Sequence, residues 1–274
     1  AMGFDEAARN FQVTNFVTGT GNDPVLAEAQ DGSGTNNANF GTSGTDGSNA
    51  RCQMYVFTGP TPDRDGDFDG DVVYHELSHG LSIRLHRGGL TGTHGGGMGE
   101  GWGDFFAICL NAEPTDNFAA VYPAGAYATY LLGGGTANYY YGIRRYPYCA
   151  DMTKSPLTYA DVDNAQYNNS GVPQGPIGSA TANEVHNVGE IWCQALLECR
   201  NEMAAAEGFN ANQIIMQLAV DGMKLAPSAP NFLQERDAIL SADQTRYGGI
   251  HQAALWRGFA KRGMGFSATS PTGG

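Results

Sequence analysis

The stretch Asp71-Val-Val-Tyr-His75-Glu76-Leu-Ser-His79-Gly80 decides the fold of this 274-residue chain. Apolar residues recur around it at intervals of three and four, which predicts a buried helix that begins at Asp71. Residues four apart share one face of a helix, so the imidazoles of His75 and His79 can bind the same Zn²⁺. Glu76 would then lie beside the metal, placed to take a proton from a water that the metal activates and to pass it to a leaving amine.

A catalytic zinc needs a third protein ligand, because it usually binds three protein atoms and leaves one position open for water. A histidine six residues after His79 would occupy position 85, which is Leu85. The other common arrangement places a glutamate on the following helix, and Glu100 stands where the helical pattern resumes. We therefore expect Glu100 to be the third ligand. Asp104, one helical turn later, would accept the other ring N–H of a ligand histidine and fix the orientation of that ring.

The N-terminal third of the chain predicts a loop-rich β region. Residues 1–70 are rich in Gly, Asn, Asp, Ser and Thr, and short β-prone runs interrupt them at residues 11–17, 38–40 and 53–57. After the HExxH helix, we expect a Gly-rich loop over residues 88–97 and a second helix over residues 99–110.

The last hundred residues predict a mostly helical region. Apolar stripes with helical spacing run through residues 184–203, 214–225, 232–240 and 251–259. Strands in one part of the chain and helices in another are typical of an α+β fold.

Charge narrows the possible partners. The chain has 15 Lys+Arg against 28 Asp+Glu, a net charge of −13. Affinity for nucleic acids depends on clustered Lys and Arg, and anionic lipid headgroups repel an acidic protein, so we expect neither nucleic acid nor membrane as a main partner. The longest apolar stretches, such as residues 214–220, are far shorter than the ~20 residues that cross a bilayer.

Segments along most of the chain resemble the fungalysin family of secreted zinc metallopeptidases. Glu100 and Asp104, as Glu-xxx-Asp after HExxH, match the arrangement of gluzincins, the thermolysin-like enzymes. The other matching segments are Gly3-Phe-Asp-Glu-Ala-Ala, Ala29-Gln-Asp-Gly-Ser-Gly-Thr-Asn-Asn-Ala-Asn-Phe40, Arg64-Asp-Gly-Asp-Phe-Asp69, Gly97-Met-Gly-Glu-Gly-Trp-Gly-Asp-Phe105, Gly142-Ile-Arg-Arg-Tyr-Pro-Tyr148 and Arg246-Tyr-Gly-Gly249.

The resemblance implies a zinc-dependent endopeptidase with a two-lobed, thermolysin-like α+β fold. We expect a β-rich lobe with the zinc-binding helices over residues 1–110 and a mostly helical lobe over residues 111–274. The enzyme would be a monomer that acts outside the cell on proteins and peptides, and its own propeptide would bind it in the precursor. Family members have further β-rich sequence before Gly3, so we expect the chain to lack part of its N-terminal lobe.

The resemblance also assigns residues around the reacting bond. His186 resembles the Val-His element with which thermolysin-like enzymes stabilise the negative charge that grows on the carbonyl oxygen. The aspartate that would orient this histidine, five residues earlier, is here Thr181, so some other group must orient His186, or none does.

Three further residues would bind the substrate. Asn37 and Ala38 resemble the edge-strand segment that pairs with the backbone of a peptide, although the sequence also fits a plain turn and strand. Arg144 resembles the arginine that holds the substrate carbonyl just past the cleaved bond. Arg145 is a close alternative, and either arginine could instead form a structural ion pair.

Calcium is a possible second cofactor. Five aspartates alternate with other residues over residues 63–71, a pattern of oxygen ligands that Ca²⁺ favours. The glutamate that would complete an EF-hand is Tyr74, so a standard EF-hand is excluded. Asp71 could bind Ca²⁺, as the resemblance suggests, or could simply stabilise the helix N-terminus.

Two other functions stay open. The expected loss of N-terminal strands favours a catalytically impaired module that binds metal or peptide without cleaving it. A zinc hydrolase acting on a non-peptide substrate would need a closed pocket in place of a groove. The presence of Glu76, Glu100 and His186 together favours a peptidase, since a binding module has no need of a group that transfers protons.

Overall fold

The computed structural model describes residues 2–165, 167, 171–177 and 181–270. The strands are β1 (Val25–Glu28), β2 (Ala38–Gly41), β3 (Ala50–Met54), β4 (Val56–Phe57) and β5 (Arg64–Asp65). The helices are α1 (Gly70–Leu85), α2 (Gly92–Asn111), α3 (Asn138–Tyr141), α4 (Val185–Glu207), α5 (Asn210–Leu225), α6 (Phe232–Tyr247) and α7 (Gln252–Lys261), with 3₁₀ helices η1 (Glu6–Ala8), η2 (Gly66–Phe68) and η3 (Tyr159–Val162).

A small sheet forms one side of the molecule. Its strand order is β1-β3-β2, so β2 is an edge strand, paired antiparallel with β3, while β1 pairs parallel with β3. A separate hairpin joins β4 and β5. The expected β run at residues 38–40 is confirmed as β2, and the run at residues 53–57 is divided between β3 and β4.

The β run expected at residues 11–17 is wrong, because this segment forms no strand. The carboxylate of Glu6 accepts the backbone N–H groups of Phe16, Val17 and Thr18, so these amides bind a side chain instead of a neighbouring strand. Phe11 packs edge-on against the rings of Phe4 and Phe40. Local hydrogen bonding has thus overridden the β propensity of this segment.

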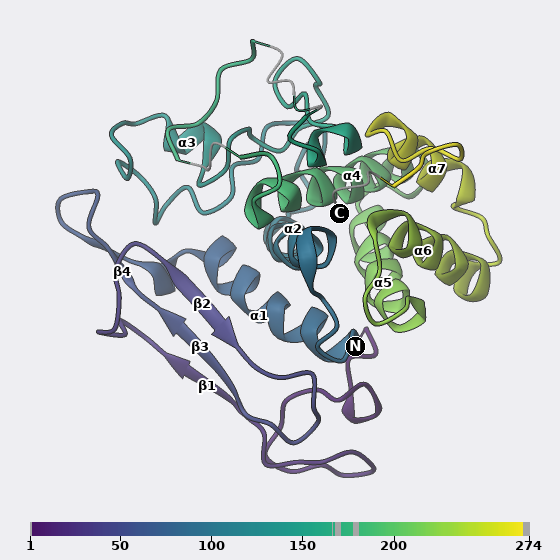
Figure 1. Ribbon diagram of the computed structural model, residues 1–274, viewed down its shortest axis with the longest axis horizontal. Helices are drawn as coiled ribbons and strands as arrows, with labels where there is room; N and C mark the ends of the chain where they lie inside the picture. Colours follow the sequence, from purple (N-terminus) through teal and green to yellow (C-terminus); the bar gives the residue numbers. More distant parts are fainter. Residues whose placement is uncertain (1, 166, 168–170, 178–180, 271–274) are drawn as a thin grey trace.

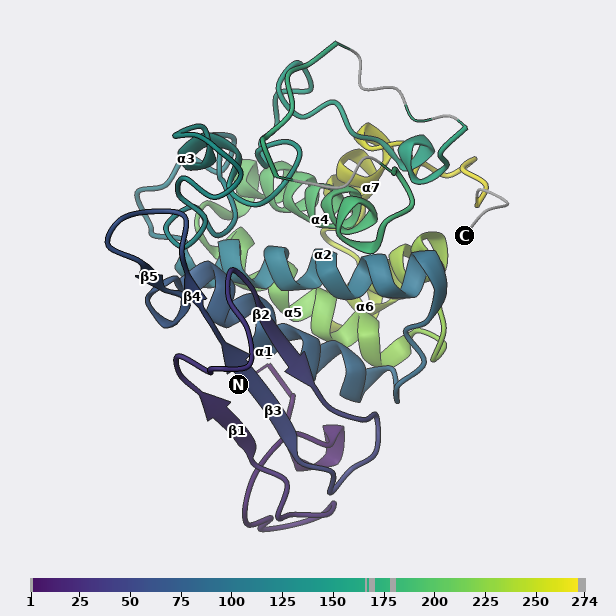
Figure 2. The ribbon, with the colours of Figure 1, turned by 60° about the vertical axis from the view of Figure 1, so that its left-hand side comes forward.

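The helices stack behind the sheet in layers. Helix α1 packs against β2 and β3 on one side and against α2 on the other, and α2 in turn packs against α4. Figure 1 shows α1 between the sheet and the helical part of the molecule, and Figure 2 shows α2 between α1 and α4. One hydrophobic core runs through α2, α4, α5, α6 and α7, with Trp102 and Trp192 fully buried in it.

The predicted Gly-rich loop is also wrong over most of its length, because α2 already begins at Gly92. The glycines allow two helices to approach closely. A Cβ added at Gly97 would lie 2.2 Å from Val188 Cγ1 on α4, which no side chain could accommodate without a shift. The sequence feature that suggests a loop is therefore a tightly packed helix face.

The remaining elements agree with the predicted α+β, thermolysin-like fold. The HExxH helix begins within one residue of the predicted start, capped by Asp69, whose side chain accepts the N–H of Asp71. The four predicted C-terminal helices are confirmed as α4, α5, α6 and α7. Among the described residues, none of the helices combines the length and hydrophobicity that a bilayer crossing requires.

Candidate metal centre

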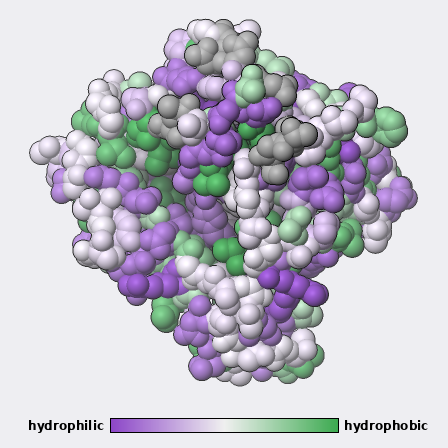
Figure 3. Space-filling view, viewed as in Figure 1, coloured by the Kyte–Doolittle hydropathy of each residue, from purple (hydrophilic) through white to green (hydrophobic). Residues whose placement is uncertain are grey.

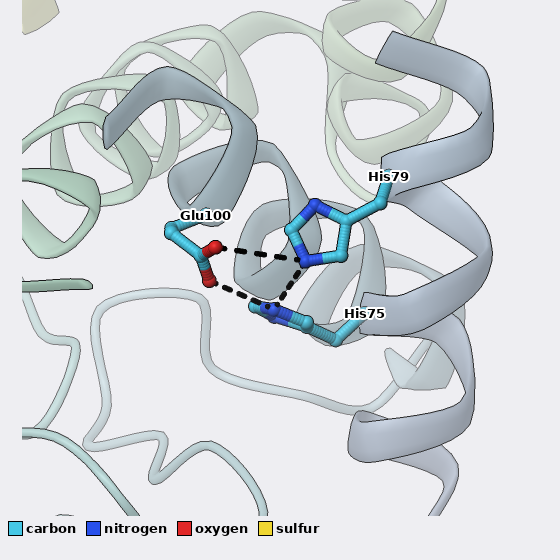
Figure 4. A group of neighbouring side chains, drawn as sticks. All are labelled: His75, His79 and Glu100. Carbon is cyan, nitrogen blue, oxygen red and sulfur yellow. Dashed lines mark hydrogen bonds and ion pairs between the residues drawn. The ribbon is translucent and has the colours of Figure 1, made fainter. Parts of the chain in front are cut away.

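Helices α1 and α2 bring together three side chains of the types that can hold a metal ion. The Nε2 atoms of His75 and His79 lie 3.1 Å apart, and Glu100 places its carboxylate oxygens 3.2 Å from His75 Nε2 and 3.8 Å from His79 Nε2. Figure 4 shows the two rings from one face of α1 and the carboxylate from α2 converging on one point. Within the described part of the chain, this is the only group of three or more such residues whose ligand atoms lie close together.

Asp104 lies behind His75. Its Oδ1 accepts the Nδ1–H of His75 at 2.8 Å, which turns Nε2 toward His79 and Glu100. Arg144 donates to both oxygens of the same carboxylate, at 2.6 Å from Nε and 2.8 Å from Nη2, and the hydroxyl of Tyr148 donates to Oδ2. All four side chains are buried, so the orientation of His75 is fixed by a fully partnered polar network.

The lack of a side chain at Gly103 leaves space for the ring of His75. A Cβ added at Gly103 would lie only 2.4 Å from His75 Nδ1. Since Gly103 directly precedes Asp104 on α2, any side chain there would push the ring away from its carboxylate partner.

The pKa values of the two histidines shift in opposite directions. Burial favours the neutral form of His75, but hydrogen bonds to Asp104 and Glu100 raise its pKa to about 10. Burial and the nearby charge of His75 lower the pKa of His79 to about 4. Despite its burial, the pKa of Glu100 is held well below its usual range by His75 and His79. The cluster therefore favours a positive charge between its donor atoms.

Glu76 lies next to these ligands and is almost fully buried, with 6% of its surface exposed. Burial raises its pKa to about 7, with the repulsion of Glu100 adding to the effect and the charge of His75 opposing it. A carboxylate with a pKa near neutrality is suited to accept and return a proton.

His186 approaches the same centre from the first turn of α4. Its Nε2 lies 3.3 Å from Glu100 Oε2, while Nδ1 lies 2.7 Å from Glu184 Oε1. Glu184 is the N-cap of α4, and its Oε2 also accepts the backbone N–H groups of His186 and Asn187. Partial burial opposes ionisation of Glu184, yet the hydrogen bond from the His186 ring keeps its pKa below the usual value.

A pocket of about 390 Å³ opens over the ligand cluster. Asn37, Ala38 and Arg144 line it, together with Glu76, His186 and the three clustered side chains described above. Ala38 is the first residue of the edge strand β2, opposite Met54 of β3. Figure 3 shows the corresponding face hollowed between the sheet and the helical part, with hydrophilic residues, in purple, at its floor.

The two neighbouring arginines have different surroundings. Arg144 lines the pocket while its guanidinium binds Asp104. Arg145 lies outside the pocket lining and donates to Glu190 and to the carbonyl oxygen of Asn187. The structure thus brings Arg144 to the site and keeps Arg145 in a structural ion pair.

The aspartates of residues 63–71 have separate partners. Asp65 accepts from the side chain of Gln30 and the N–H of Asp67, and Asp69 caps α1. Asp71 accepts the side-chain N–H of Asn111 and the backbone N–H of Gly125. These contacts divide the acidic run among several parts of the fold.

Glu184 is the site residue that the sequence analysis missed. The family pattern predicts an orienting acid five residues before His186, where this chain has Thr181, whereas in the structure Glu184, two residues before it, binds the ring. The available signal was an acid at the N-cap of a helix whose first turn carries the histidine.

The fold and this ligand cluster define a class, the thermolysin-like metallopeptidases. The chain belongs to the fungalysin metallopeptidase (M36) family, whose model matches residues 1–268. This confirms the resemblance to the fungalysin family that the sequence motifs carry.

Relatives from several fungi are 40–42% identical to the chain over the aligned residues. An extracellular metalloproteinase MEP of Neosartorya fischeri is 41% identical over 287 residues, covering 97% of this chain and 41% of the relative. An extracellular metalloproteinase MEP of Fusarium vanettenii is 42% identical, covering 99% of this chain and 42% of the relative. Extracellular metalloproteinase 2 of Trichophyton rubrum is 40% identical, over 97% and 41% of the two chains. The chain thus spans about two fifths of the length of these relatives.

Proposed function

We propose that this chain carries the active site of a secreted zinc endopeptidase, which cleaves internal peptide bonds of proteins. The observation that carries the proposal is the convergence of His75, His79 and Glu100, with Glu76 beside them and all ligand atoms within 4.8 Å of one another. The extracellular relatives support secretion, and the family supports proteins as substrates.

The donor atoms fit zinc in type and spacing. Tetrahedral bonds of about 2.0–2.1 Å place neighbouring ligand atoms roughly 3.3–3.4 Å apart. The two Nε2 atoms lie 3.1 Å apart, and the carboxylate of Glu100 lies 3.2 Å from His75 Nε2 through Oε2 and 3.8 Å from His79 Nε2 through Oε1, which brackets that value. Two imidazoles and one carboxylate also leave a fourth position open, as in catalytic zinc sites.

Zinc held by these residues would supply Lewis acidity, which polarises the peptide carbonyl and lowers the pKa of water so that a nucleophile is available at neutral pH. Glu76 would accept the proton of the attacking water and later deliver it to the leaving amine. Burial supports this role, because a pKa of about 7 allows Glu76 both to accept and to return a proton near neutral pH.

With a proton on each ring nitrogen, His186 would donate one hydrogen bond from Nδ1 to Glu184 and one from Nε2 to the carbonyl oxygen as that oxygen gains negative charge. Glu184 would be its positioning residue, since it binds Nδ1 and leaves Nε2 facing the cluster. A carboxylate already fixed by two backbone N–H groups at the helix start can hold the ring in one orientation.

The substrate would bind as an added strand along β2. This strand has a free edge, because only β3 pairs with it in the sheet formed by the described residues. Asn37 and Ala38 would contact the peptide backbone at the start of that edge, next to the metal ligands. Arg144 would hold the carbonyl past the cleaved bond while remaining bound to Asp104.

Three broader expectations belong to the same proposal. The β-rich part with the metal-binding helices, residues 1–110, and the helical part, residues 111–274, would act as the two lobes that flank the cleft. The precursor would carry an inhibitory propeptide, and the mature enzyme would be a monomer.

Hydrolysis of casein tests the proposal. The wild-type protein should cleave casein, and 1,10-phenanthroline should stop cleavage. Glu76→Gln should reduce the rate by at least about 10²-fold while zinc content stays unchanged, because the proton acceptor is lost and the ligands are not. The exposed Glu113→Gln is the matched control and should keep full activity. Cleavage that survives phenanthroline or Glu76→Gln would contradict the mechanism, and a folded, zinc-loaded wild type that cuts nothing would contradict the function.

A further inference from the structure

Most of the basic side chains of this acidic protein form ion pairs, but a few do not. Ten of its 15 Lys and Arg side chains form ion pairs with carboxylates. Arg64 and Arg200 instead lie over aromatic rings, at 4.7 Å from the Tyr127 centroid and 4.2 Å from the Phe118 centroid. Within the part of the chain that the structure describes, only Arg9, Arg87 and Lys224 have neither kind of partner.

All three line the same pocket, which has a volume of about 640 Å³. The N-terminal segment with η1, the residues after α1 and the end of α5 form its walls, and Figure 1 shows the N-terminus beside these helix ends. Asp5 is the one acidic side chain among the described lining residues, and its carboxylate already accepts the N–H of Ala8. The amino group of Lys224 donates to the carbonyl oxygen of Gly3, so it is held in place without being neutralised.

Both arginines are held in an unusual backbone conformation. Arg9 has φ 63° and Arg87 has φ 55°, in the left-handed region that non-glycine residues seldom adopt. Hydrogen bonds from their backbone N–H groups, to Glu6 and Arg84, fix these turns. Burial and the charge of Arg87 lower the pKa of Arg9, and the nearby carboxylate of Asp46 only partly opposes them, as expected where like charges are held together. Strained residues of this kind tend to occur at binding sites.

We propose that this pocket is a binding site for a small anion that carries two or more negatively charged oxygen groups. Two guanidinium groups offer paired donors to a carboxylate or phosphate, and the ammonium group adds a third charge. A pocket of this volume is of the size that small-molecule ligands occupy. The site is distinct from the pocket over the metal ligands and shares no lining residue with it.

Calorimetric titration with citrate and with tripolyphosphate tests the proposal and separates the two sources of charge. At least one of these probes should bind the wild-type protein, and more weakly at high NaCl, since part of the attraction is screened. The triple variant Arg9→Gln, Arg87→Gln, Lys224→Gln should bind that probe at least tenfold more weakly. Casein hydrolysis should not change in the triple variant, so the outcome is independent of the proposed peptidase function.

The matched control removes the same charge elsewhere. Arg51, Arg246 and Arg257 have side chains that are 52%, 45% and 59% exposed and form surface ion pairs. Changing these three to Gln should leave the affinity within twofold of wild type. Equal weakening in both triple variants would overturn the proposal in favour of general charge attraction, and so would the absence of binding at millimolar probe. If the triple variant unfolds, Arg87→Gln alone is used, because this side chain is exposed and forms no ion pair with the described residues. It should also bind the probe more weakly than the wild type, and an unchanged affinity would overturn the proposal.

Discussion

His75 and His186 present two ways of holding a histidine at one site. His75 binds a carboxylate 29 residues away on another helix, and its side chain is 11% exposed. His186 binds a carboxylate two residues away at the start of its own helix, and its side chain is 51% exposed. The two hydrogen bonds are nearly equal in length, at 2.8 and 2.7 Å.

The difference lies in what else depends on each carboxylate. Asp104 also neutralises the buried guanidinium of Arg144, so His75 is tied to the packing of α1, α2 and the segment with Arg144. Apart from binding the His186 ring, Glu184 only caps the first turn of α4. A change at Asp104 should therefore affect stability and metal binding together, whereas a change at Glu184 should affect turnover alone.

The largest effect is expected for Asp104→Asn. Arg144 would keep its buried charge without a counter-charge, which typically destabilises a protein by about 3–5 kcal/mol. Loss of the group that orients His75 should also weaken zinc affinity about 10–100-fold. Urea unfolding and competition with a zinc chelator measure the two effects.

Glu202→Gln provides the control for Asp104→Asn. It breaks the exposed pair with Arg257 and should change the free energy of unfolding by no more than about 1 kcal/mol. Equal losses of stability in the two variants would contradict the larger effect that we assign to the buried Asp104 network.

A smaller effect is expected for Glu184→Gln. The amide oxygen can still cap α4, but the negative charge next to His186 is lost, so we expect kcat to fall about tenfold, or ~1.4 kcal/mol, with KM and zinc affinity unchanged. Glu184→Asp, which restores the charge, should recover part of the loss. Adding Glu184→Gln to His186→Ala should cause no further decrease in kcat, because Glu184 would act only through the ring. Independent losses in the double variant would argue against the positioning role.

This comparison also shows how far the sequence could lead. The spacing of His75 and His79 follows from helix geometry, and Asp104 follows from lying one turn after Glu100 on the next helix. Glu184 was missed because the family pattern drew attention to Thr181. The choice between Arg144 and Arg145 depends on which of two adjacent side chains faces the pocket, and no periodicity in an irregular segment reveals that. The glycines of α2 predict a loop from sequence alone, because their close contact with α4 is a tertiary feature.

Asp71→Asn should have the smallest effect on stability. Unlike Asp104, which pairs with Arg144, Asp71 forms no ion pair with the described residues. Asp71 lies near the start of α1, and burial, helped by the charge of Asp69, raises its pKa to about 6. Because this folded-state pKa lies above the ordinary value of 3.8, the protonated form stabilises the fold below about pH 4, and this contribution is lost as the pH rises through 6. The shift limits the contribution to the free energy of unfolding to about 3 kcal/mol at neutral pH.

In Asp71→Asn, the asparagine keeps an acceptor for Gly125 but loses one for Asn111. We therefore expect the free energy of unfolding to rise by about 1 kcal/mol at pH 7 and to vary less between pH 4 and 6. Thermal unfolding across that range measures both. A calcium-dependent rise in the wild-type midpoint that Asp71→Asn abolishes would instead show that Asp71 has a cation of its own, as Asp104 has in Arg144.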